Sequence, residues 1–82
     1  MIDIYQEIFD NTFEAVLRTL DERAKSQGLT YVEAEHELES IYRYDGLDWG
    51  GRGEMKQAEN DGTILAYQVF IDKSKKEEES AS

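Results

Sequence analysis

The residues best suited to bind a ligand lie in a glycine-rich segment near the middle of the chain. Residues 46–53 read Gly-Leu-Asp-Trp-Gly-Gly-Arg-Gly, and Glu54 follows them. Glycines let the backbone approach a ligand closely, Trp49 offers a large amphipathic surface, and Arg52 carries a rigid fork of donors near the start of a helix. Such a set would suit a carboxylate, a phosphate or a protein surface. The alternative is structural, with Trp49 plugging the open end of a helical hairpin and Arg52 paired with a neighbouring carboxylate.

Metal and nucleophile chemistry have little support in the sequence. The chain has no cysteine and a single histidine, His36, which excludes thiolate zinc sites and multi-histidine centres within one chain. Glu33 and His36 have the Glu-x-x-His spacing of di-metal helix bundles, but only a symmetric dimer could complete such a site. Ser40 lies one helical turn from His36 without an oxyanion cradle. We therefore predict no enzymatic activity, no metal and no cofactor.

Repeated glutamates in the second predicted helix form another candidate surface. At the i, i+4 spacing of a helix, Glu33 lies over Glu37 and Glu35 lies over Glu39, and each like-charge pair is mildly destabilising. Only Glu39 has a basic partner in the same helix, Arg43. Destabilising residue pairs that nothing in the local sequence offsets often indicate function. These carboxylates are therefore a candidate surface for an acidic inhibitor or nucleic-acid mimic that binds a basic protein. The alternative is a solvated face that maintains solubility.

The overall charge indicates which partners to expect. The chain has 19 acidic and 9 basic residues and a formal net charge of −10 at pH 7. Such a body repels free nucleic acid and anionic lipid, because phosphate binding depends on clustered lysine and arginine. No apolar run is long enough to span a membrane, and the acidic N-terminus lacks the positive region of a secretory signal. We therefore expect a cytoplasmic protein that binds neither nucleic acid nor membranes.

Apolar spacing predicts a first helix from Asp3 to about Gln27. Its apolar residues recur three and four positions apart, which places them on one side of a helix. Asp3 is a suitable N-cap, and Gln6 is placed to reach back and complete a capping box. Gly28 supplies the left-handed residue that ends many helices.

A second helix follows after a very short turn. Thr30 and Glu33 repeat the capping-box pattern, and Leu29 is placed to pack against Ala34. The apolar spacing continues to about Tyr44. We therefore predict two antiparallel helices, followed by a loop over the glycine-rich segment.

Residues 63–72 fit either a buried strand or a helix. Their β-branched and aromatic content suits a strand, but the chain offers no second strand to pair with it. We favour a helix from Gly53 to Asp72. Its predicted packed face comprises Met55, Ala58, Gly62, Leu65, Ala66 and Val69. The triplet Asn60-Asp61-Gly62 would either split this helix or mark a close crossing with the first helix. Residues 73–82 are predicted to be a disordered charged tail.

The size of the expected core favours self-association. Residues 1–72 form the predicted domain. A core of this size gives a folding stability of only about 3 to 5 kcal/mol unless a disulfide, a metal or oligomerisation adds to it. Ile64, Tyr67 and Ile71 form a second apolar stripe on the third helix, opposite the predicted packed face. We therefore predict a homodimer. The alternative is that these side chains wrap under the first helix or lie partly exposed.

The stretch from Tyr42 to Phe70 resembles a small acidic bacterial protein family of uncharacterised function. The residues that carry the resemblance are Asp48-Trp49, Gly51-Arg52-Gly53-Glu54, Ala66-Tyr67 and Phe70. The resemblance implies a bacterial, cytoplasmic, helical protein and brings no activity or ligand with it.

The sequence therefore predicts an all-α three-helix bundle, a helical hairpin plus a long third helix, that acts as a homodimeric protein-interaction module. The expected partners are a second copy of the chain and an unidentified protein. The candidate protein-binding residues are Trp49, Arg52, Glu54, Ile64, Tyr67 and Ile71, and the alternative acidic face comprises Glu33, Glu35, Glu37 and Glu39.

Overall fold

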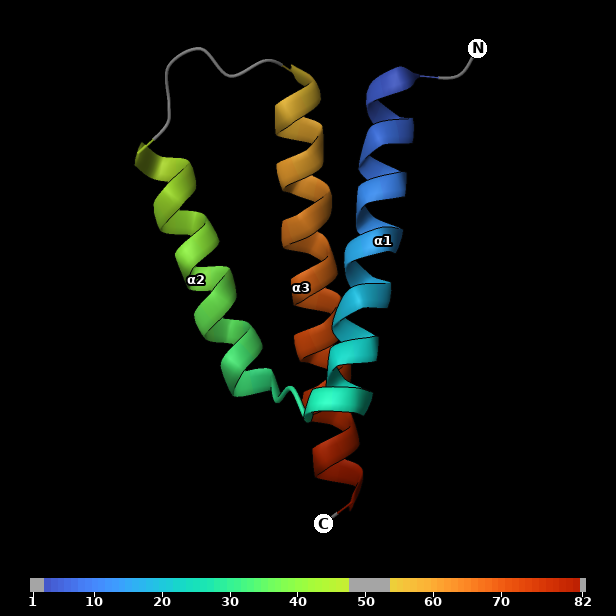
Figure 1. Ribbon diagram of the computed structural model, residues 1–82, viewed down its shortest axis with the longest axis vertical. Helices are drawn as coiled ribbons and strands as arrows, with labels where there is room; N and C mark the ends of the chain where they lie inside the picture. Colours follow the sequence, from blue (N-terminus) through green and yellow to red (C-terminus); the bar gives the residue numbers. More distant parts are fainter. Residues whose placement is uncertain (1–2, 48–53, 82) are drawn as a thin grey trace.

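The computed structural model, which describes residues 3–47 and 54–81, is all-helical over those residues. The helices are α1 (Ile4–Gln27), α2 (Tyr31–Leu47) and α3 (Glu54–Ala81). Figure 1 shows α3 between the other two helices, parallel to α1 and antiparallel to α2. The backbone of α3 packs against both neighbours, whereas α1 and α2 do not pack closely on each other. The predicted three-helix, all-α fold is confirmed, and no helix within the described ranges is both long and apolar enough to cross a membrane.

The ends of α1 follow from its sequence. Asp3 is the N-cap, and its Oδ1 accepts a hydrogen bond from the Tyr5 backbone N–H at 2.9 Å. Gly28 ends the helix with φ 71°, in the left-handed region that glycine adopts without strain. The predicted capping box is not formed, because the Gln6 amide donates to Asp10 Oδ1 one turn further on, at 3.0 Å.

The second helix begins as predicted and ends later than predicted. Thr30 Oγ1 accepts a hydrogen bond from the Glu33 backbone N–H at 3.3 Å, and Leu29 and Ala34 are both buried. The helix continues to Leu47, although residues 46 and 47 were predicted to be loop. A single glycine costs a helix only about 1 kcal/mol relative to alanine, so it does not by itself end one.

The third helix is continuous, as favoured over a strand, and Gly62 does not split it. A Cβ atom on Gly62 would lie 2.7 Å from the Phe9 carbonyl oxygen and 3.2 Å from the Phe13 nitrogen, both in α1. Gly62 therefore marks a close crossing of α1 and α3. Ala58 and Ala66, on the same side of α3, are also buried.

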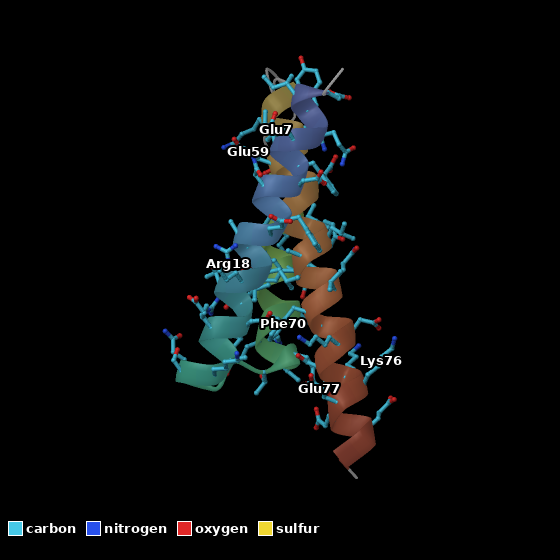
Figure 2. All side chains as sticks on the ribbon, turned by 90° about the vertical axis from the view of Figure 1, so that its right-hand side faces the viewer. Glu7, Arg18, Glu59, Phe70, Lys76 and Glu77 are labelled. Atoms are coloured by element: carbon cyan, nitrogen blue, oxygen red, sulfur yellow. The ribbon has the colours of Figure 1, made fainter. Side chains whose placement is uncertain are left out.

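The core forms where all three helices meet. Its buried members are Leu20, Leu29, Ala34, Leu38, Phe70 and Ile71, and partly buried apolar side chains that pack against them are Val16, Leu17, Ala24, Tyr31, Ile64 and Tyr67. Figure 2 shows Phe70 on the side of α3 that faces α1. This cluster lies towards the end of the bundle at which α1 connects to α2.

The structure corrects the predicted faces of α3. Leu65 and Val69, predicted to be packed, are each 37% exposed, whereas Ile71, predicted to face outward, is only 8% exposed. Ile64 and Tyr67 also pack against the core. The reason is the central position of α3, which must bury one side against α1 and another against α2. A single apolar stripe cannot describe a helix with two neighbours.

The structure also differs from the predicted disordered tail, because α3 continues to Ala81. This segment contains no glycine or proline, and its lysines reach the rest of the bundle. Lys73 Nζ lies 3.9 Å from Asp21 Oδ1 of α1, and Lys75 Nζ lies 3.1 Å from Glu35 Oε1 of α2. These contacts favour a helical conformation for a segment that has no apolar face of its own.

Candidate protein-binding surface

The glycine-rich loop lies largely outside the described residues. Trp49 and Arg52 are both in the segment 48–53, and Glu54 is the first residue of α3. A binding role for this loop therefore stays a prediction.

One of the predicted acidic residues, Glu37, belongs to a cluster that joins all three helices. Arg23 of α1 forms a bidentate pair with it, with Nη1 2.9 Å from Oε1 and Nη2 2.7 Å from Oε2. Tyr67 of α3 donates its hydroxyl to Glu37 Oε1 at 2.8 Å. Tyr67, predicted to face a partner, thus has its hydroxyl inside the bundle. No local pattern indicates this cluster, because Glu37 is separated from its partners by 14 and 30 residues.

The cluster perturbs two pKa values in opposite directions. Hydrogen bonding to Arg23 lowers the pKa of Glu37, and the Tyr67 hydroxyl adds to the effect while partial burial opposes it. Burial raises the pKa of Tyr67, and its hydrogen bond to the Glu37 carboxylate raises it further. At neutral pH the cluster therefore holds an ionised carboxylate between a cation and a neutral hydroxyl. This is the arrangement of a structural tie between helices.

Two of the other three glutamates of α2, Glu35 and Glu39, are also partnered. Glu35 pairs with Lys75, whose Nζ lies 5.6 Å from the centre of the Tyr31 ring. Glu39 pairs with Arg43 at 3.4 Å. The pairs with Arg23 and Lys75 provide compensation for like-charge repulsion that the sequence alone did not reveal. The like-charge repulsion that suggested an acidic binding face on α2 is therefore partly offset within the bundle.

The Glu-x-x-His spacing does not form a cluster of metal ligands. Glu33 and His36 are both exposed. Within residues 3–47 and 54–81, no group of three or more acidic or histidine side chains is placed to hold a metal ion.

A groove lies between α1 and α3. Its volume is about 290 Å³, and its lining comprises Ala15, Val16, Thr19, Leu20, Arg23, Thr63 and Tyr67. Its polar groups are already engaged. Thr19 and Thr63 donate their hydroxyls to carbonyls one turn back in their own helices, and Arg23 and Tyr67 bind Glu37. The groove therefore has no spare polar anchor for a small molecule.

The side of α3 opposite this groove carries an exposed row of residues, which we call the outer stripe. It comprises Asp61, Leu65, Val69, Asp72 and Lys76. These residues recur at helical spacing and all are exposed. Figure 2 shows Lys76 on the side of α3 that faces away from α1. Neither neighbouring helix covers this row, because α1 and α2 contact other sides of α3.

Contacts at the borders of the outer stripe confirm that it lies between the neighbouring helices. On the α2 side, the Gln68 amide donates to the Tyr42 hydroxyl at 3.1 Å. On the α1 side, Lys73 lies within ion-pair distance of Asp21. Leu65 and Val69 therefore form a small apolar centre with polar contacts on both flanks.

The chain as a whole exposes more surface than a compact protein of its size. A folded chain of 9.5 kDa is expected to expose about 5,000 Å², whereas this chain exposes 6098 Å². Its radius of gyration is 14.2 Å, compared with about 12 Å for a compact domain of the same length. Part of this excess comes from the C-terminal end of α3, which projects beyond the other two helices (Figure 1).

Comparison with known proteins finds no match, since no family model, no curated protein and no solved structure matches the chain.

Proposed function

We propose that the protein is a non-enzymatic interaction module that binds another protein through the outer stripe of α3. The observation that supports this most strongly is that the central helix of the bundle exposes adjacent apolar side chains, Leu65 and Val69. A central helix is normally the best-covered element of a bundle. Leaving its apolar residues in water costs about 25 cal/mol for each Å² of apolar surface, and a partner would remove that cost.

The charges beside the apolar pair suit a protein partner better than a lipid or nucleic acid. Asp61 and Asp72 lie on the stripe with Lys76, so it carries charges of both signs. A phosphate-binding surface would need clustered basic residues. We further propose a cytoplasmic location, which the resemblance to a bacterial family and the absence of cysteine favour.

Photo-crosslinking in cells that express the chain tests this function. A photoreactive amino acid is introduced at position 65 in one variant and at position 32 in a control. Val32 is the matched control, because it is an apolar residue that is 51% exposed on α2. We expect discrete crosslinked species from position 65 and none from position 32. Equal crosslinking from both positions, or none from either, would contradict the proposal.

A further inference from the structure

We propose that α2 separates from α1 and α3 while those two helices stay packed together, and that the contact of Glu37 with Arg23 and Tyr67 opposes this separation. We call this event α2 opening. It goes beyond the proposed function, because it assigns a movement to α2, which carries no residue of the outer stripe. Three observations support it: where α2 is buried, how its side chains are held, and how α1 and α3 contact each other.

The buried part of α2 lies near its start. Of the α2 residues whose side chains are described, Ala34 and Leu38 are buried, and Leu29 is buried just before the helix. Residues 39–43 are all exposed or half-buried. Figure 1 shows the C-terminal end of α2 further from α3 than its N-terminal end. Because apolar burial is the main force that holds a helix in a bundle, α2 is held mainly through its first half.

The polar contacts that hold α2 are accessible to water. The side chains of Arg23 and Glu37 are 32% and 35% exposed, and Glu35 and its partner Lys75 are exposed residues. Water and salt weaken ion pairs at such positions. The Glu37 pair is the stronger of the two, because it is bidentate and also accepts the Tyr67 hydroxyl. Breaking it is therefore the main polar cost of α2 opening.

The contact between α1 and α3 extends beyond the part of the bundle that α2 shares. At Gly62 the backbone of α3 lies directly against the backbone of α1 at Phe9. Ala58 and Ala66, on the same side of α3, are buried and lie outside the three-helix core. Over the described residues, α1 and α2 do not pack closely on each other. Removal of α2 would therefore leave the close crossing of α1 and α3 in place.

A separated α2 would not remain helical. Isolated helices of about 15 residues are marginal in water even when they are rich in alanine, and α2 has 17 residues with a single alanine. Its like-charge pairs, Glu33 with Glu37 and Glu35 with Glu39, would also lose the basic partners that α1 and α3 supply. The opening is therefore detectable as a loss of the backbone hydrogen bonds of α2, and it would expose the side of α3 that carries Tyr67.

Amide hydrogen exchange, measured by NMR at low urea concentrations that leave the chain folded, tests whether the opening occurs. We expect the amides from Ala34 to Leu38 to exchange at least about 10-fold faster than the most protected amides of α1 and α3. Their opening should also become easier as urea rises, because it exposes more surface than fraying does. Exchange of all three helices through one shared opening, or exchange of α2 that urea does not affect, would overturn the proposal.

A substitution in α3 tests whether α1 and α3 stay packed when α2 opens. Ala66→Gly weakens α3, which remains folded during α2 opening. It should therefore speed exchange of the most protected amides of α1 and α3 about 5-fold and leave the amides of α2 unchanged. Ala58→Gly serves as the second variant, and circular dichroism verifies that each variant is folded. If both variants sped exchange equally in all three helices, the bundle would open as one unit and the proposal would fail.

A matched pair of substitutions in α2 tests the role of Glu37. Glu37→Gln removes a contact that α2 opening breaks, so it should speed exchange of the α2 amides about 5-fold. Glu39→Gln is the control, because Glu39 pairs with Arg43 within α2 and ties the helix to neither neighbour. Its effect should be about 2-fold or less. A Glu37→Gln variant that speeds α2 exchange no more than Glu39→Gln does would overturn the assignment of Glu37 as the contact that opposes opening.

Discussion

The two sides of α3 differ in how completely the rest of the chain covers them. On the inner side, Gly62 lies against α1, Ala66 is buried, and Phe70 is only 3% exposed. On the outer side, Leu65 and Val69 are each 37% exposed. Both sides carry apolar residues, so composition does not distinguish them. The comparison indicates that the inner side stabilises the monomer, whereas the outer side is available for binding.

Replacing Phe70 should have the largest effect, because it removes the most deeply buried aromatic residue of the inner side. Large-to-small changes at buried aromatic positions cost about 3 to 5 kcal/mol, which approaches the total stability of a small domain. We expect Phe70→Ala to be largely unfolded by circular dichroism at 25 °C. A cooperative transition close to that of the wild type would show that the inner side contributes less than its burial implies.

The close crossing of α1 and α3 should be sensitive to a single methyl group. Gly62→Ala places a Cβ 2.7 Å from the Phe9 carbonyl oxygen, which is backbone and cannot move aside locally. We expect a loss of about 1 to 3 kcal/mol in urea unfolding, because overpacking outweighs the gain of about 1 kcal/mol in helix propensity. Glu59→Ala, at an exposed position one turn away, is the control. A stabilised Gly62→Ala variant would mean that the helices separate easily at this point.

The Glu37 cluster should make the stability of the bundle depend on acid. Because hydrogen bonding to Arg23 lowers the pKa of Glu37 in the folded chain, the cluster stabilises the fold above the unfolded pKa of about 4.5 and is lost as pH falls through the folded value. We expect Glu37→Gln to cost about 1 kcal/mol at pH 7, since a carboxylate side chain that is 35% exposed is partly screened.

The pH dependence itself provides the check on this assignment. Urea unfolding is measured between about pH 6 and pH 3 for both chains. The wild type should lose stability more steeply on acidification than Glu37→Gln does. Parallel curves would assign the acid dependence to other carboxylates.

Changing the outer side should affect the monomer least. Leu65→Ser removes an exposed side chain, and such substitutions usually change stability by about 0.5 kcal/mol or less. The measurement is urea unfolding at a dilution where the chain is monomeric. A loss near that of Phe70→Ala would show that Leu65 belongs to the core and would remove the contrast between the two sides of α3.

Local signals predicted the elements of the fold well. Asp3 and Gly28 delimit α1 because a cap and a left-handed glycine act within one helical turn of the residues that they stabilise. The choice of helix over strand for residues 63–72 was correct, because a strand without a partner leaves its backbone unpaired. Of the two alternatives for Asn60-Asp61-Gly62, a split helix or a close crossing with α1, the structure shows the close crossing.

The same signals failed wherever an interaction joined distant parts of the chain. Ile71 was placed outward and Val69 inward because helical periodicity groups apolar residues without indicating which neighbour each group meets. The partners of Glu37 and Glu35 could not be predicted from the spacing in α2, because Arg23 and Lys75 lie in other helices. Residues 73–82 were predicted to be disordered, because their composition does not reveal the contacts of Lys73 with α1 and of Lys75 with α2.

The sequence by itself determined where the described helices begin and that residues 54–72 form a helix, since both depend on neighbouring residues. It also determined the strong negative charge, which depends only on composition. Only the tertiary structure decided that α3 is the central helix. That placement depends on how three amphipathic helices divide their apolar surfaces among themselves, which involves all three at once. It buried Ile71, joined Glu37 to Arg23 and Tyr67, and left Leu65 and Val69 partly exposed.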